Sequence, residues 1–426
     1  MPDDPRRRTP RTDAVLADPA VAGAAERLGR ARVKSVVVAV LDDVRSGSVD
    51  PSDAAAEVLS RLPAAATSLR PVVNATGVVV HTNLGRAPLS AAAVAAVRLA
   101  AGPTDVEMDL GTGRRGPRGT GALGALAAAV PDAGGVHVVN NGAAALSLVA
   151  CALAQGREVV IARGELVEIG DGFRIPELLE SMGVRLREVG TTNRVRLADY
   201  EAAVGPATAF VLKVHPSNFR VEGFTSSVPV SELTGLGLPV VVDIGSGLLA
   251  PHPRLPDEPD AASVLREGAS LVTASGDKLL GGPQCGLLLG EAALVESLRR
   301  HPFARALRVD KLTLAALEAT LTGPPSPVAA ALATRPEDLM GRARRIAEEL
   351  GGVAVASEGR VGGGGAPGVP LASAAVALSP DLAKALRLGD PSVVGHVHDG
   401  RLLLDLLTVP AELDDVLVEA VRRAAT

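Results

Sequence analysis

Apolar residues recur at helical spacing through the first part of the chain, in three segments with short polar stretches between them. The segments are residues 14–29, 31–47 and 51–62. Apolar positions three and four apart predict amphipathic helices. Asp13 and Ser52 stand where N-caps are expected, and Gly47 where the middle helix is expected to end. The pattern predicts a small helical domain over residues 1–66, with a joint near Pro71.

A different pattern follows, in which short apolar runs alternate with amphipathic stretches such as residues 143–154. The runs predicted to be strands are residues 136–139, 159–161, 209–214, 240–242 and 271–273. Continuous Val, Leu and Ile runs separated by helices are typical of a parallel sheet covered on both faces. Residues 67–321 are therefore predicted to form a large α/β domain.

The Pro- and Gly-rich stretch at residues 322–330 predicts the next joint. Beyond it come a helical segment, short strands around the glycine-rich sequence VGGGGAPGVP (361–370), and a closing helix from Glu412. This order predicts a small α+β domain over residues 322–426.

Composition narrows the class of protein. The chain has 426 residues, 47% hydrophobic and 21% charged, which is a globular balance. Aromatic residues make up only 1%, so the core must consist of Ala, Val and Leu. The two cysteines, Cys151 and Cys285, predict neither a disulfide framework nor a metal site. No signal sequence or membrane span is evident, which predicts a cytoplasmic protein.

The most reactive pattern is the sequence from Ser275 to Gly282, SGDKLLGG, which follows an apolar run. A lysine at a strand end, in a pocket that lowers its pKa, can attack an aldehyde. Ser275, three residues before Lys278, can bind a phosphate oxygen, and paired glycines let the backbone approach a ligand. Taken alone, the motif is as compatible with a plain structural interpretation, a helix N-cap followed by a surface lysine, as with this reactive site.

Two further elements occur in the order that pyridoxal phosphate requires. Asp243 ends the apolar run PVVVD and can face a pyridinium nitrogen. Asn141, Gly142 and Ala143 follow a run and open a helical stretch, so backbone N–H groups there can receive a phosphate. Separately, Asp243 could simply cap a turn, and the second element could be a plain strand–turn–helix. Their combination with Lys278 predicts a pyridoxal-phosphate site.

Several longer segments resemble a known family. They are VVNATGVVVHTNLGRAPLS (72–90), RGELVEIGDGFRIPELL (163–179), GTTNR (190–194), KVHPSNFRVEGFT (213–225), VVDIGSG (241–247), SGDKLLGGPQ (275–284) and HPFARALRVDKLTLAALEATL (301–321). Together they resemble bacterial L-seryl-tRNA(Sec) selenium transferase, or selenocysteine synthase. The resemblance implies an α/β, aspartate-aminotransferase-like fold of type I, with a mainly parallel sheet in the large domain.

The resemblance also implies residue roles. Lys278 would carry pyridoxal 5'-phosphate as a Schiff base and move the Cα proton, with Asp277 as an active-site acid. Asp243 would face the pyridinium nitrogen. The phosphate contacts would come from Ser275, Gly142 and Ala143. Asn218 would lie near the phenolic oxygen of the cofactor, and Thr191 and Thr192 would be polar active-site positions.

Three arginines would bind selenophosphate, the selenium donor that the resemblance implies: Arg86, Arg305 and Arg308. Arginines converging on one point suit a multiply charged anion. Without the resemblance, Arg305 and Arg308 would be assigned to surface ion pairs. Two positions depart from the family pattern, namely Leu407, where an arginine is expected, and Asp171, where glycine is usual.

The implied reaction is a β-replacement that converts L-seryl-tRNA(Sec) to L-selenocysteinyl-tRNA(Sec). Homo-oligomers are implied as well, built from dimers that can assemble into a decameric ring; neither a membrane nor DNA is an expected partner. The net charge of −5 argues mildly against a nucleic-acid partner, because binding to phosphates requires local positive charge. The alternatives are a pyridoxal-phosphate lyase acting on a small amino acid or amino sugar phosphate, and a non-enzymatic protein that retains only the fold.

Overall fold

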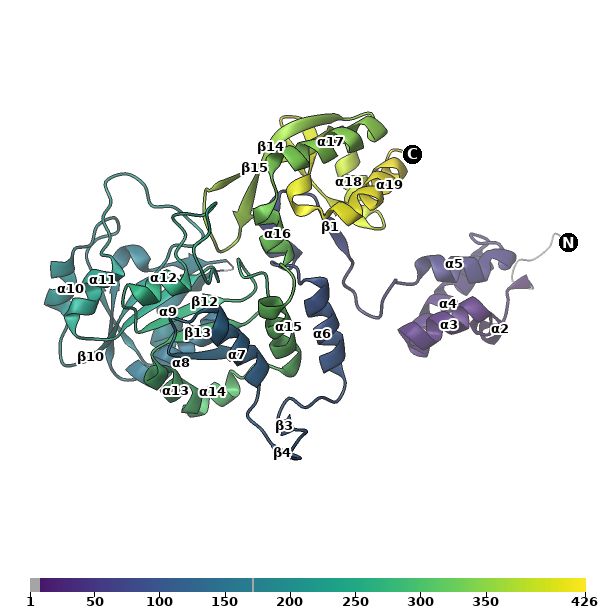
Figure 1. Ribbon diagram of the computed structural model, residues 1–426. Helices are drawn as coiled ribbons and strands as arrows, with labels where there is room; N and C mark the ends of the chain where they lie inside the picture. Colours follow the sequence, from purple (N-terminus) through teal and green to yellow (C-terminus); the bar gives the residue numbers. More distant parts are fainter. Residues whose placement is uncertain (1–7, 171) are drawn as a thin grey trace. The chain divides into compact units, whose positions relative to one another are not determined.

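The structure is a computed structural model that describes residues 8–170 and 172–426; Asp171 lies outside the described residues. The chain divides into two compact units, Met1–Pro71 and Val72–Thr426. Figure 1 shows an N-terminal unit made of helices and a larger unit of mixed helices and strands. In the described part of the chain, no helix is both long and apolar enough to cross a membrane.

The N-terminal unit packs its helices around a core of its own. Its elements are α2 (Thr12–Leu16), α3 (Pro19–Leu28), α4 (Arg30–Ser46), η1 (Pro51–Asp53) and α5 (Ala54–Arg61). On α4 the buried positions Val33, Val37, Val40 and Val44 form one stripe at helical spacing. Gly47 ends this helix with φ of 81°, a left-handed conformation that glycine adopts without steric cost.

The two predicted N-caps of this unit are wrong. Asp13 lies inside the first turn of α2, which has no side-chain cap. The cap predicted at Ser52 is provided by Asp50, whose carboxylate accepts the Ser52 N–H at 2.9 Å. Both aspartates still lie close to a helix N-terminus, where negative charge is favourable.

The large unit is built on a seven-stranded sheet, which contains all five predicted strands. In spatial order the strands are β5 (Gly135–Val139), β13 (Gly286–Gly290), β12 (Leu271–Ser275), β11 (Val240–Gly245), β10 (Thr208–Val214), β6 (Glu158–Ala162) and β9 (Arg185–Val189). β13 is antiparallel to both of its neighbours, and every other pairing is parallel. The predicted mainly parallel sheet is confirmed.

Helices cover both faces of this sheet, and the side chains of β11 show why. Val240, Val242 and Ile244 join the core under one face, whereas Val241 joins the core under the other. The first face is covered by α7 (Thr120–Ala129), α10 (Leu197–Ala203), α12 (Ala261–Arg266) and α15 (Lys311–Thr322). The second is covered by α8 (Gly142–Ala154), α9 (Ile175–Ser181), α13 (Ala292–Arg300) and α14 (Pro302–Ala306).

A second sheet joins the two ends of the large unit. Its order is β17 (His396–His398), β18 (Arg401–Asp405), β15 (Pro370–Leu378), β14 (Val353–Gly362) and β2 (Val78–Val80). In addition, β1 (Val72–Asn74) pairs with β16 (Ser392–Val394). Around them lie α16 (Pro327–Ala333), α17 (Pro336–Leu350), α18 (Leu382–Leu388) and α19 (Asp414–Ala424). Residues 72–80 therefore contribute strands to the C-terminal part of the chain.

Leu407 belongs to the core of this C-terminal part. Its side chain is 5% exposed, and its N–H donates to the buried Asp405 at 2.9 Å. A Cβ on Gly359 would lie 2.4 Å from Leu407 Cδ2, so the strand β14 passes directly over it. The leucine at this position therefore has a packing role.

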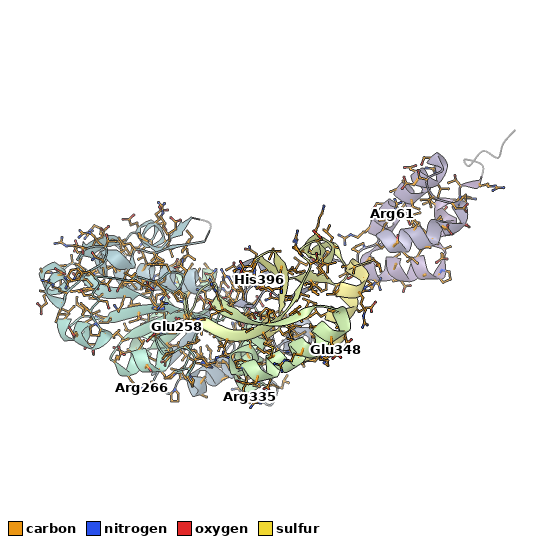
Figure 2. The ribbon with its side chains drawn as sticks, turned by 90° about the horizontal axis from the view of Figure 1, so that it is seen from above. Arg61, Glu258, Arg266, Arg335, Glu348 and His396 are labelled. Atoms are coloured by element: carbon orange, nitrogen blue, oxygen red, sulfur yellow. The ribbon has the colours of Figure 1, made fainter. Side chains whose placement is uncertain are left out.

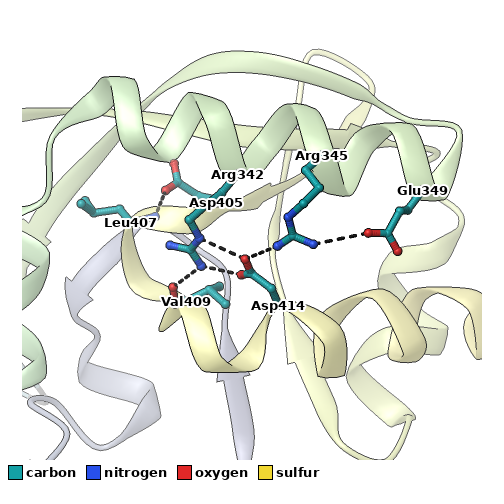
Figure 3. A network of polar contacts seen from close by, with 7 residues as sticks. All are labelled: Arg342, Arg345, Glu349, Asp405, Leu407, Val409 and Asp414. Carbon is teal, nitrogen blue, oxygen red and sulfur yellow. Dashed lines mark hydrogen bonds and ion pairs between the residues drawn. The ribbon is translucent and has the colours of Figure 1, made fainter.

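A buried acid joins α17 to α19. Asp414 accepts hydrogen bonds from Arg342 at 2.5 and 3.2 Å and from Arg345 at 2.6 Å (Figure 3). Arg342 also donates to the Val409 carbonyl at 2.9 Å. Asp414 is 4% exposed, so removing its charge would leave the Arg342 guanidinium with too few acceptors.

We therefore expect Asp414→Asn to destabilise the large unit by about 2–3 kcal/mol, since breaking a largely buried ion pair costs roughly 3–5 kcal/mol and Arg345 is partly exposed. Urea unfolding would measure the loss. The matched control is Asp415→Asn, at the exposed neighbouring position. Equal stability of the two variants would contradict the prediction.

Candidate active site

A pocket lies at the carboxyl ends of the parallel strands and contains Lys278. The cavity measures about 270 Å³, and its lining includes Arg86, Gly142, Ala143, Ser217, Asp243, Ser275 and Lys278. These residues follow or end β5, β10, β11 and β12, apart from Arg86. The carboxyl ends of parallel strands meet at one edge of a sheet, which is why residues far apart in sequence converge here.

Lys278 lies three residues beyond β12, and its side chain is largely buried. Burial lowers the pKa of its amine, while the carboxylates of Asp243 and Asp277 act in the opposite direction. The glycine-rich turn at residues 362–365 lies against its aliphatic chain. A Cβ on Gly364 would lie 2.5 Å from Lys278 Cε, and the φ of 94° there is one that glycine adopts without strain.

Asp243 occupies a buried position on β11. Burial raises the pKa of its carboxyl group, and a hydrogen bond from Thr273 and the charge of Lys278 partly oppose that rise. The Thr273 hydroxyl donates to Asp243 Oδ1 at 2.7 Å. A cation placed beside this carboxylate would stabilise its ionised form.

The start of α8 forms the far side of the pocket. Asn141 caps the helix by accepting the Ala144 N–H at 2.7 Å, and the first intrahelical bond runs from Ala145 N–H to the Asn141 carbonyl. The N–H groups of Gly142 and Ala143 therefore remain for another acceptor. A Cβ on Gly142 would lie 2.7 Å from Ser275 Oγ, so glycine keeps this space open. The arrangement suits an anion.

Asp277 and Arg86 form an ion pair at the rim, with 2.7 Å between Arg86 Nη1 and Asp277 Oδ2. The backbones are joined too, because the Ala87 N–H donates to the Asp277 carbonyl at 3.1 Å. Arg86 has φ of 67°, which is uncommon for a residue other than glycine. The pair therefore ties the segment after β2 to the lysine motif.

The structure places three of the predicted polar residues outside this pocket. Asn218 is exposed and donates to the Glu168 carbonyl at 3.1 Å. Thr191 and Thr192 line a neighbouring cavity of about 410 Å³, which shares Val214 and His215 with the lysine pocket.

Arg305 and Arg308 do not line the lysine pocket of their own chain. Both are exposed, and Arg308 lies 3.5 Å from Glu107 Oε1. Glu107 also contacts Arg115 at 2.9 Å and Arg118 at 3.1 Å, and hydrogen bonds from Arg118 and Arg115 lower its pKa. Arg115, Arg118 and Arg308 thus form a basic cluster around the Glu107 carboxylate.

Sequence reasoning missed the glycine-rich turn and Glu258 as parts of this site. The run of four glycines from residue 362 was the available signal for the turn. Glu258 lies in no recognisable motif, and its contacts are made with residues 43 and 108 positions away.

The fold and the pocket define an α/β protein with a largely buried lysine in a pocket at the carboxyl edge of a mainly parallel sheet. Residues 72–410 match the family described as L-seryl-tRNA selenium transferase, and residues 6–45 match the family described as Selenocysteine synthase N terminal. The chain belongs to the L-seryl-tRNA(Sec) selenium transferase family.

Individual relatives agree with this assignment. L-seryl-tRNA(Sec) selenium transferase of Moorella thermoacetica is 44% identical, over 98% of this chain and 97% of the relative. The protein of the same name from Hyphomonas neptunium is 41% identical, over 98% of each. These names favour a transferase over the lyase and over a non-enzymatic protein.

Among solved structures, D-glucosaminate-6-phosphate ammonia-lyase is similar, with a TM-score of 0.59 and 18% identity, over 84% of this chain and 97% of that one. At this identity the likeness concerns the fold alone. The predicted fold type I is confirmed.

Proposed function

We propose that this chain converts L-seryl-tRNA(Sec) to L-selenocysteinyl-tRNA(Sec), with pyridoxal 5'-phosphate on Lys278 and selenophosphate as the selenium donor. In the reaction the β-hydroxyl of the seryl group is replaced by selenium. The observation that carries the proposal is the Lys278 pocket, found in a chain of the selenium transferase family.

The pocket fits this cofactor at three points. Lys278 is a buried amine whose pKa is lowered by burial, which suits bonding to an aldehyde. Asp243 would face the ring nitrogen. Ser275, with the N–H groups of Gly142 and Ala143, would hold the phosphate in the space that a Cβ on Gly142 would fill. When bound, pyridoxal phosphate supplies an electron sink for the charge left when Cα loses its proton.

The residues of the chain would divide the remaining work. Lys278 Nζ would accept the Cα proton, because burial favours the neutral form of its amine. Asp277 would hold Arg86 at the rim through their ion pair. Arg86 is partly exposed there, which places a cation where an anionic donor would enter. Asn218, Thr191 and Thr192 remain proposed polar contacts for the cofactor or substrate.

A direct test is to incubate the purified protein with seryl-tRNA(Sec) and selenophosphate and to identify the aminoacyl group by mass spectrometry. Selenocysteine on the tRNA is expected. Recovery of unchanged serine in the presence of bound cofactor would count against the proposed reaction. Omission of selenophosphate is the matched control.

We also propose that Arg305 and Arg308 bind the donor. They lie outside the pocket of their own chain, so the proposal requires a homo-oligomer in which they complete the site of another copy. Changing both to alanine should lower selenium incorporation at least about tenfold, since a hydrogen bond to a charged group contributes roughly 1.5–3 kcal/mol. Attachment of the cofactor should not change. Arg300→Ala, an exposed arginine on α13, is the control.

Complementation tests the shared site. Co-expressed Lys278→Ala and Arg305→Ala/Arg308→Ala chains should recover activity up to about a quarter of the wild-type level, because half of randomly formed dimers contain one intact site of two. Wild-type selenophosphate dependence in the double variant would instead assign Arg305 and Arg308 to surface ion pairs.

A further inference from the structure

Glu258 is a buried acid between β11 and α12 that lies outside the motifs of the family. Its side chain is 1% exposed. One oxygen, Oε2, accepts the Ala366 N–H at 2.7 Å and lies 3.2 Å from His215 Nε2. The other oxygen, Oε1, is buried and has no hydrogen-bond partner among the described residues. A carboxylate held in this way is costly to bury, so its position calls for a specific explanation.

The two partners of Glu258 belong to two segments close to Lys278, one that lines its pocket and one that packs against its side chain. His215 follows β10, lines the pocket, and donates its backbone N–H to the Asp243 carbonyl at 2.9 Å. Ala366 ends the glycine-rich turn between β14 and β15. In Figure 2 Glu258 lies near the place where the central sheet approaches these two strands.

The turn itself lies directly against the reactive lysine. At Gly364, where φ is 94°, an added Cβ would lie 2.7 Å from Lys278 Nζ. At Gly365 an added Cβ would lie 2.9 Å from Leu279 Cδ1. Four successive glycines have an unusually large conformational freedom to lose. The start of the turn is held by β2, since the Gly363 N–H donates to the Val80 carbonyl at 3.0 Å, and the Glu258 contact holds its other end.

We propose that Glu258 is a positioning residue whose carboxylate holds the glycine-rich turn against Lys278 by accepting the Ala366 N–H. We call this contact between Glu258 and Ala366 the latch. Through His215 the same oxygen fixes the turn relative to the end of β10. The latch encloses the lysine amine on the side of the C-terminal strands and limits its contact with water. Its functional meaning rests on the proposed role of Lys278, but the contact can be tested without that role.

Two conservative variants of Glu258 separate the effect of side-chain length from the effect of charge. Glu258→Gln keeps the length of the side chain and an acceptor oxygen but loses the charge. Glu258→Asp keeps the charge but is one methylene shorter, so it no longer reaches Ala366. A latch therefore tolerates glutamine and fails with aspartate, whereas a purely electrostatic role would show the reverse.

Hydrogen exchange of the cofactor-free protein, followed by mass spectrometry of peptides covering residues 360–369, measures the latch. In Glu258→Asp we expect exchange at the turn to accelerate about ten- to hundredfold, and in Glu258→Gln to stay within about threefold of wild type. Asp257→Asn, one residue away and exposed, is the control and should match wild type. Labelling of Lys278 by an amine-directed reagent should rise in Glu258→Asp alone.

Faster exchange in Glu258→Gln than in Glu258→Asp, or unchanged exchange in both, would overturn the proposal. Should Glu258→Asp fail to fold, Glu258→Ala replaces it, because alanine also lacks an acceptor for the Ala366 N–H and the same acceleration relative to Glu258→Gln is expected. Neither measurement uses cofactor or tRNA. Failure of the Glu258 proposal can therefore be distinguished from failure of the proposed selenium transfer.

Discussion

Replacing Lys278 by alanine should remove the covalent attachment of pyridoxal phosphate and lower formation of selenocysteinyl-tRNA at least about 10³-fold. The reason is that one amine would serve both as the attachment point and as the base at Cα. The fold should survive, because the substitution removes a largely buried polar group and creates no clash with the neighbouring glycine-rich turn. Borohydride reduction followed by peptide mapping would locate the attachment in the wild-type protein.

The control for this variant is Lys384→Ala, at an exposed position on α18, which should retain both attachment and activity. Lys213 offers a sharper check, since it also ends a central strand but forms an ion pair with Glu165 at 2.9 Å. A reduced adduct mapped to Lys213, or to any lysine other than Lys278, would disprove the assignment of the site.

The centre of the site could be predicted from sequence because each part is local to one strand end. Lys278, Asp243 and the Gly142 turn each follow an apolar run, and the parallel sheet brings such ends together. The surroundings could not be predicted in the same way. Glu258 depends on a hydrogen bond to Ala366, 108 positions away, and no periodicity encodes that distance.

Two features of the fold were hidden for physical reasons. β9 has mostly exposed side chains at the edge of the sheet, so its sequence RLREV lacks the apolar run of its neighbours. Strands β1 and β2 look like the start of the large α/β domain, yet they pair with β16 and β14 from the C-terminal part. Local pattern cannot identify a partner about 300 residues away.

Deleting Met1–Pro71 should leave the cofactor bound and abolish tight binding of tRNA(Sec). This unit has a core of its own, built from residues such as Val21, Val33 and Val58, so its removal need not disturb the cores of the large unit. The seryl group cannot distinguish one serine-accepting tRNA from another, so the enzyme must recognise the tRNA at a distance from Lys278. We expect the affinity to fall at least about 100-fold, toward the level of non-specific binding.

Within this unit, the contact surface is predicted to include Arg27, Arg30, Arg32 and Lys34, which are all exposed. Reversing their charges should weaken tRNA binding and flatten its salt dependence, because each lost phosphate contact reduces the slope of log K against log salt by roughly one. Filter binding across a salt series would measure both effects. Arg45→Glu, near the other end of α4, changes the charge of the unit without touching the cluster and is the matched control. If the truncated protein kept its affinity, or if Arg45→Glu flattened the slope as much as reversal of the cluster, tRNA recognition would have to be sought in the large unit.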